Sequence, residues 1–205
     1  SYSKEYLNHL GTTLSLVYTG QSGARFSYLI AGDPGRYTAG SSSDQYSLMY
    51  IPRDASEIKF VQNGDVTPEQ QWNAFNEFIE ANPYLKNRRG QYAERNGDKA
   101  PFSHRFDFRI LQDVFTNIGN TKNKIQISLD VMNVGALINK KWGEQYSGGG
   151  SFWDNSFRPI NFDSFQQNTN IPQYKLGNLN ENTPYFVSDI PSRWSAQLGV
   201  RYIFN

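Results

Sequence analysis

Strict alternation of apolar and polar side chains marks the last part of the chain. Apolar residues recur at every second position from Trp194 to Phe204. The positions between them include Ser195, Gln197, Gly199 and Arg201. A period of two is the pattern of a strand whose faces meet different surroundings. About ten such residues, ending in aromatics, suit a tilted strand that crosses a bilayer, so we predict such a strand over residues 192–204.

A second pair of alternating segments predicts a tight hairpin over residues 104–115 and 124–134. In each segment, apolar residues alternate with charged or polar ones. The connection between them is short and polar, as a hairpin turn requires. We expect both strands to be antiparallel neighbours with one apolar and one polar face.

The register of this hairpin can be predicted from the same pattern. If the numbers of paired residues sum to about 239, Arg109 faces Asp130 on the polar face. The same register places Ile110 opposite Leu129 on the apolar face. A structure with Arg109 and Asp130 on opposite faces would contradict it.

The first part of the chain predicts another strand, over residues 10–30. Leu14, Leu16 and Tyr18 share one face, and the same parity resumes at Phe26. The glycines between these runs are compatible with a hairpin turn. The preserved parity favours one long strand.

Strand periodicity disappears in two long segments, residues 33–103 and 135–191. Loops of this length are uncommon in a compact domain unless they have a function or internal structure. We therefore expect each to be a built surface or a binding element.

A short helix is expected inside the first of these segments. Thr67 is a suitable N-cap, Pro68 suits the first helical position, and Glu69 lies near the positive end of the helix dipole. Pro83 should limit the helix. The apolar residues that recur at helical spacing are Trp72, Phe75 and Ile79.

Composition and charge narrow the classes of partner and compartment. Lys and Arg number 20 against 19 Asp and Glu, which leaves no global field to attract nucleic acid. The chain has no cysteine, which excludes disulfides and thiolate sites. No stretch approaches the 18 or so apolar residues of a spanning helix. A mean hydropathy of −0.65 with 15% aromatic residues is typical of transmembrane barrels, which have polar lumens and aromatic girdles.

Several segments, in this order and spacing, resemble the C-terminal barrel of TonB-dependent outer-membrane transporters. The resemblance is to the subfamily with an N-terminal carboxypeptidase-regulatory-like domain, and it covers most of the chain. The segments are Gly20–Gly23 with Phe26–Tyr28, Leu48–Pro52, Tyr92–Gly97, His104–Asp107, Leu129–Gly135 and Gln197–Phe204.

The resemblance implies an all-β fold, an antiparallel transmembrane β-barrel fragment. Residues 1–205 would supply the last four strands of a barrel of about 22 strands, with 33–103 and 135–191 as extracellular loops. The other strands, the plug and the segment that contacts TonB would lie outside this sequence, because an open sheet edge is costly in lipid. The location would be a Gram-negative outer membrane, in contact with its lipid and with a possible surface lipoprotein. Tyr202 and Phe204 resemble the family's assembly signal, although Asn205 follows where an aromatic usually ends the chain.

Candidate chemistry is sparse. His9 and His104 are far apart in the sequence and have no carboxylates at ligand spacing, and no nucleophile elbow, P-loop or HExxH motif occurs. We therefore expect no enzyme activity, metal or cofactor. Four charges alternate with apolar residues on the predicted strands and could pair as general acid and base, but we favour salt bridges that line the lumen. They are Arg105, Asp107, Arg109 and Asp130.

Aromatic residues in the two long segments are the candidates for substrate or partner contact. Trp72 belongs to the helical stripe, which we expect to pack on its own loop. Trp153, Phe157 and Phe162 follow or lie near a glycine patch and suit stacking on a sugar or gripping a peptide. A basic run at Lys86–Arg89 is expected to be a solvated face, with an outer-leaflet contact as the alternative.

Three functions remain open. Transport, with substrate bound at the extracellular face, follows from the resemblance. A structural barrel that docks a surface or secretion partner is the second. A soluble β-sandwich such as a carbohydrate-binding module is the third, and the two long loops argue against it.

Overall fold

The chain folds into two compact units. The structure is a computed structural model that describes residues 1–7, 9–32, 47–118, 121–148, 156–179 and 185–204. The first, here the sheet unit, comprises Ser1–Gly23, Pro101–Tyr146 and Val187–Asn205. The second, here the core unit, comprises Ala24–Ala100 and Ser147–Phe186. Among the described residues, no helix is both long and apolar enough to cross a membrane.

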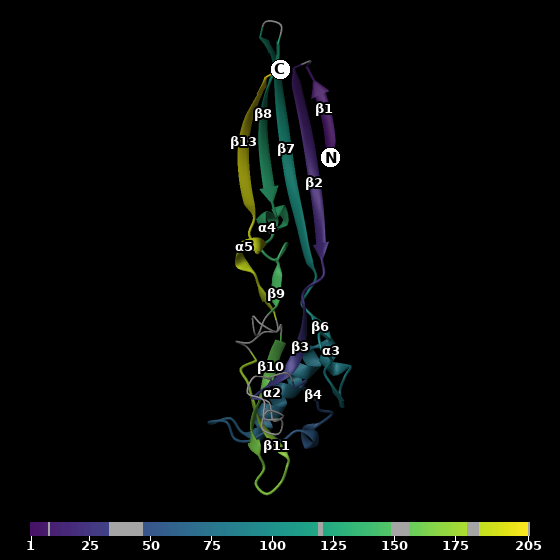
Figure 1. Cartoon of the computed structure of the whole chain (residues 1–205), viewed down its shortest axis with the longest axis vertical. Helices are drawn as coiled ribbons and strands as arrows, with labels where there is room; N and C mark the ends of the chain where they lie inside the picture. Colours follow the sequence, from purple (N-terminus) through teal and green to yellow (C-terminus); the bar gives the residue numbers. More distant parts are fainter. Residues whose placement is uncertain (8, 33–46, 119–120, 149–155, 180–184, 205) are drawn as a thin grey trace. The chain divides into compact units, whose positions relative to one another are not determined.

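The sheet unit is built on one five-stranded antiparallel sheet (Figure 1). Its strands, in spatial order, are β1 (Tyr2–Tyr6), β2 (Leu10–Gln21), β7 (Ser103–Ile118), β8 (Thr121–Met132) and β13 (Ser195–Phe204). Two short helices belong to the same unit, α4 (Val134–Ile138) and α5 (Asp189–Ser192). The strands confirm the all-β class, and the described sheet is open, with β1 and β13 at its edges.

The predicted hairpin register is confirmed. Arg109 pairs with Asp130 across β7 and β8, and Ile110 pairs with Leu129. The two strands are longer at the turn than expected. At the other end, β8 stops at Met132 because Asn133 adopts a left-handed backbone with φ 53° and α4 follows.

Strand β1 was not predicted. Tyr2 and Tyr6 have the right parity, but Lys4 interrupts the apolar alternation between them. The sheet therefore has five strands where four were expected. Likewise, the strand predicted from residue 192 begins at Ser195, because α5 occupies the residues up to Ser192.

The core unit contains a four-stranded sheet and most of the helical residues. In spatial order the strands are β11 (Pro172–Leu176), β10 (Ser156–Phe165), β3 (Arg25–Ala31) and β6 (Asp98–Lys99). Its helices are η1 (Ala55–Glu57), α2 (Pro68–Ala81) and α3 (Pro83–Lys86). Two two-stranded sheets complete the fold, β4 (Tyr50–Ile51) with β5 (Gln91–Tyr92) and β9 (Tyr146–Gly148) with β12 (Tyr185–Val187).

The single strand expected over residues 10–30 is divided in two. β2 ends at Gln21, and β3 begins at Arg25 in a different sheet, where it runs parallel to β10. Five consecutive residues of β3 are buried, so both of its faces are covered. The preserved parity that favoured one strand was therefore misleading, because β3 belongs to a closed core.

Most of the described residues of the two long segments that were expected as loops pack in this unit around one hydrophobic core. Phe26, Tyr28 and Phe75 are completely buried and come from β3 and α2. Phe157 joins them from β10, more than 120 positions after β3 in the chain. This core gives the unit an internal source of stability.

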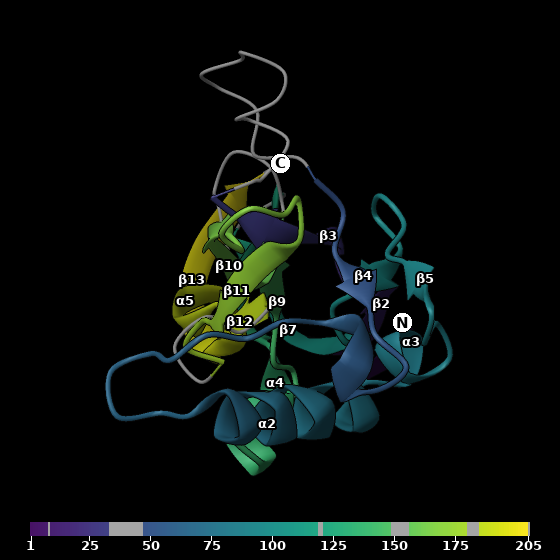
Figure 2. The same cartoon turned by 90° about the horizontal axis from the view of Figure 1, so that it is seen from below.

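The predicted helix is confirmed as α2 (Figure 2). Thr67 caps it through a capping box with Gln70, and Pro68 is its first residue. Gln71 is buried in its first turns, donates to Val61 O at 2.7 Å and accepts from Leu176 N of β11 at 2.8 Å. One polar side chain thus joins the helix to the neighbouring sheet.

Candidate functional site

The most prominent surface of the sheet unit is an exposed apolar face on its five strands. Leu198 is 71% exposed and Val200 is 72% exposed, although both lie in the middle of β13. One row crosses the sheet from β2 to β13 through Leu14, Ile110, Leu129 and Leu198. Further exposed members of this face are Tyr2, Leu16, Tyr18, Phe106, Ile125, Ile127 and Phe204.

Aromatic residues stand at both ends of this face. Tyr18, Phe106 and Trp194 mark one end, and Tyr202 and Phe204 mark the other. From Trp194 to Phe204 the strand advances ten residues, which is about 33 Å at about 3.3 Å per residue. A tilt of about 40° reduces this to a height of roughly 25 Å, the size of the apolar band of outer-membrane barrels.

Two of the polar residues on the apolar face, Thr12 and Gln112, bond to each other. Thr12 and Gln112 are directly opposite, and Thr12 Oγ1 donates to Gln112 Oε1 at 2.6 Å. Tyr6 Oη also donates to Gln112 Oε1, at 3.2 Å, and Gln112 Nε2 donates to Gly11 O at 3.1 Å. Because these groups bond to protein atoms, they need no water on that face.

The opposite face carries the four charges predicted to line a lumen, and the structure brings them together in two ion pairs. Arg109 Nε lies 3.0 Å from Asp130 Oδ1 across β7 and β8. Arg105 Nη2 lies 2.7 Å from Asp107 Oδ2 on β7. All four side chains keep some exposure, as partners in a hydrated environment would.

A third ion pair on this face was not predicted. Lys124 Nζ lies 3.2 Å from Asp113 Oδ2, and Gln126 donates to Asp113 Oδ1 at 2.8 Å. The predicted register could have revealed this ion pair, because it places Asp113 opposite Gln126 and diagonal to Lys124. The ladder of paired charges thus extends toward the turn of the hairpin.

Tyr202 and Phe204, the candidate assembly signal, both lie on the apolar face. Tyr202 Oη donates to Asn123 Oδ1 at 2.6 Å, which anchors the ring to β8. Phe204 is one of the most exposed apolar residues. Their role in assembly stays a prediction, and Asn205 lies outside the described residues.

Asn133 organises the opposite end of the sheet. It is 2% exposed; its Nδ2 donates to Gly143 O and Ser192 O, each at 3.0 Å, and its backbone N donates to Asp107 Oδ1 at 2.9 Å. Gly143 has φ +75°, and an added Cβ would lie 1.9 Å from Asn133 Oδ1. One asparagine therefore fixes the segments that follow β8 and precede β13.

The predicted contact residues of the core unit have different environments. Phe157 is 1% exposed in the core, so its assignment as a contact residue was wrong: it packs against Tyr28 and Phe78. Trp72 and Phe162 are partly buried against the same cluster, and their contact role stays a prediction. Trp153 lies outside the described residues, as does most of the glycine patch.

Tyr28 shows how this core accommodates a polar group. Its hydroxyl donates to Asp98 Oδ2 at 2.9 Å and accepts from Asn82 Nδ2 at 2.8 Å. Burial raises the pKa of Tyr28 far above its ordinary value, and the negative charge of Asp98 adds to the shift. The ring is therefore a neutral structural element at any physiological pH.

The basic run at 86–89 is part of the fold of the core unit. Lys86 and Arg89 both pair with Glu80, at 2.9 and 2.8 Å, and Arg88 pairs with Glu94 at 2.8 Å. Hydrogen bonds from Lys86 and Arg89 lower the pKa of the Glu80 carboxyl. These charges are compensated locally, which weakens the alternative of an outer-leaflet contact.

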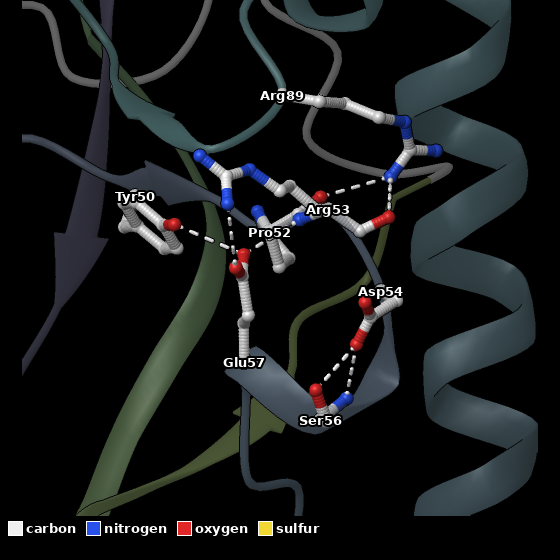
Figure 3. Close-up of polar contacts among 7 residues, drawn as sticks. All are labelled: Tyr50, Pro52, Arg53, Asp54, Ser56, Glu57 and Arg89. Atoms are coloured by element: carbon white, nitrogen blue, oxygen red, sulfur yellow. Dashed lines mark hydrogen bonds and ion pairs between the residues drawn. The ribbon is translucent and has the colours of Figure 1, made fainter.

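A cleft of about 600 Å³ in the core unit was not anticipated from the sequence. Its lining includes Tyr50, Glu57, Lys59, Tyr92 and Tyr174. Figure 3 shows the turn that forms one wall: Tyr50 Oη donates to Glu57 Oε2 at 2.9 Å, and the backbone N of Arg53 donates to the same oxygen at 2.8 Å. The hydrogen bond to Glu57 raises the pKa of Tyr50. Arg89 supports the turn by donating to Pro52 O at 2.9 Å.

Histidine chemistry is not supported by the arrangement of the described residues. His104 Nδ1 lies 2.9 Å from the hydroxyl of Tyr18, within the aromatic end of the apolar face. Among the described residues, no group of three or more His, Cys, Asp or Glu side chains has the arrangement of a metal site.

No family model, curated protein or solved structure matches the chain. The two faces of the sheet and the family resemblance of the sequence are therefore the features that bear on function.

Proposed function

We propose that this chain is part of a TonB-dependent outer-membrane receptor and transporter. The sheet unit forms barrel wall, its apolar face meets lipid, and its charged face meets the lumen. The core unit lies at the extracellular face, where substrate binds. The remaining strands, the plug and the segment that contacts TonB complete the protein.

The observation that supports this proposal best is the contrast between the two faces of one sheet. The apolar face has exposed residues on all five strands and aromatics at both ends, whereas the opposite face carries three ion pairs. Burying this apolar area is strongly favourable, and a bilayer provides the apolar phase over the required height.

The connections between strands support the orientation. The turn between β7 and β8 and the one between β1 and β2 are short and lie at the same end of the sheet. The chain segments that connect to the core unit all start at the opposite end of the sheet. At that end Gln21 pairs with Ser103, and Met132 pairs with Ser195. Outer-membrane barrels have short periplasmic turns and long extracellular loops.

A soluble sandwich explains the sheet less well, because its apolar face would be covered by a second sheet. Leu198 and Val200 on this face are more than 70% exposed in this structure. A docking barrel would share the same wall, and the resemblance favours transport over it.

The proposed orientation can be tested in intact cells, since the chain has no cysteine of its own. Asp65→Cys, in an exposed turn of the core unit, should react with a membrane-impermeant maleimide on whole cells. Thr121→Cys, beside the β7–β8 turn, should react only after the outer membrane is opened. Equal labelling of both sites in whole cells would contradict the proposal.

The transport half of the proposal needs a separate test. The protein, extracted in detergent, should be retained by the purified periplasmic domain of TonB. Outer-membrane location without such retention would favour the docking barrel.

A further inference from the structure

Two adjacent lysines, Lys140 and Lys141, lie in the turn after α4. Among the described residues, neither Lys140 nor Lys141 makes a salt bridge, whereas the neighbouring acids are engaged. Glu144 accepts a hydrogen bond from Tyr146 Oη at 2.7 Å, and Asp189 pairs with Arg193. Among the described residues, the turn thus presents two lysines outside any ion pair, together with the carboxylate of Glu144.

Each lysine stands at the rim of a different groove of the sheet unit. Lys141 borders a groove of about 260 Å³ that is lined mainly by Phe102, Phe106 and Trp142. Lys140 borders one of about 680 Å³, and its apolar lining includes Leu137, Ile138 and Trp194. Ile138 is 71% exposed. Both grooves have a largely apolar lining with a lysine at the rim. Glu144 also lines both, and the larger groove adds the ion pair between Arg193 and Asp189.

The grooves continue the apolar face of the sheet. Phe106 belongs to that face on β7, and Trp194 continues its alternation just before β13. Both are among the aromatic residues at the end of the sheet from which the chain connects to the core unit. A lipid whose chains lie on this face would place its head group near the 140–141 pair.

We propose that the turn at residues 139–144 binds the phosphate of an anionic membrane lipid. Lys140 and Lys141 contact the phosphate, and the acyl chains follow the two grooves. The charges are complementary, because a phosphodiester is anionic and lysine is a compact cation. The apolar floors favour a lipid over a free anion. This inference rests on the proposed function, since it requires that end of the sheet to lie at the membrane surface.

The test uses the protein extracted from membranes and placed in nanodiscs with equal amounts of phosphatidylglycerol and phosphatidylcholine of the same chain length. Native mass spectrometry of the released complexes counts the lipids that are retained. The unaltered protein should prefer phosphatidylglycerol. At about fivefold for each lysine near a membrane surface, Lys140→Gln with Lys141→Gln should reduce that preference roughly 25-fold.

A matched control removes the same charge from the core unit through Lys59→Gln and Lys99→Gln. This control should keep the preference, and an unchanged heat-dependent gel shift should verify that every variant is folded. Equal retention of both lipids by the unaltered protein, or an unchanged preference in the Lys140 and Lys141 variant, would overturn the inference and leave the proposed function intact. Absence of the protein from membranes would overturn the proposed function as well.

Discussion

The two units use apolar residues in opposite ways. In the core unit, Phe26 and Phe75 are fully buried in a cluster that closes on itself. In the sheet unit, Leu198, Val200 and Phe204 lie on a regular strand and are more than 70% exposed. The same residue types are thus buried by the chain in one unit and left for an external phase in the other. Apolar content alone therefore does not identify a core; the strand's second face has to be considered.

The largest expected change in stability comes from a substitution in the buried core of the core unit. Phe75→Ala should destabilise the core unit by about 3–5 kcal/mol, because it removes a fully buried ring and leaves a cavity. The rate of backbone hydrogen exchange in α2 and β10 would measure it. Phe186→Ala, at a residue that is exposed, is the matched control and should have little effect. Similar exchange in both variants would contradict the account of the core.

A smaller effect is expected on the apolar face of the sheet. Leu198→Arg should cost about 2–4 kcal/mol, because on the proposed barrel wall it would place a charge near the middle of the bilayer. The urea dependence of folding into liposomes would measure it. Gln197→Arg, on the other face of the same strand, should change stability by less than about 1 kcal/mol. If the two variants cost the same, the two faces do not meet different phases.

The ion pair between Arg109 and Asp130 tests whether the polar face of the sheet is hydrated. In a hydrated lumen, a double-mutant cycle with Arg109→Gln and Asp130→Asn should give a coupling of about 1 kcal/mol or less that salt reduces. In a dry interior, loss of one partner would cost about 3–5 kcal/mol. Stability of the single variants at low and high salt separates these environments.

The smallest effect concerns an exposed pair in the core unit. Lys175 Nζ lies 2.6 Å from Asp163 Oδ1, and the hydrogen bonds of Lys175 and then Ser164 lower the pKa of Asp163. A carboxyl with a depressed folded-state pKa stabilises the fold above its unfolded pKa, about 3.9, and loses this contribution as pH falls through the folded value.

Asp163→Asn should therefore lower the melting temperature of the core unit slightly at pH 7. The difference from the unaltered protein should vanish in strong acid, below the folded-state pKa. A difference that persists there would show that Asp163 acts through packing.

Local patterns in the sequence predicted the elements that depend on near neighbours. The register that pairs Arg109 with Asp130 follows from alternation and a short turn, and the limits of α2 follow from Thr67 and Pro83. The two faces of β13 were equally predictable, because successive side chains of a strand point to opposite faces of the sheet.

Contacts between distant segments were not predictable in this way. The parallel pairing of β3 with β10 joins residues such as Ser27 and Ser156, and no local pattern specifies such a partner. Phe157 was misassigned for this reason, because an aromatic residue looks the same in sequence whether it meets a ligand or a core. The network of Asn133 also depends on residues close only in space, Gly143 and Ser192.

The most direct test of the central claim is the environment of successive side chains along β13. Single cysteines at positions 197, 198, 200 and 201 would be labelled with an environment-sensitive fluorophore in the membrane-inserted protein. The account predicts blue-shifted emission that lipid-borne nitroxide quenches at Leu198 and Val200, and aqueous emission at Gln197 and Arg201. Emission that is the same at all four positions, whether aqueous or apolar, would contradict it.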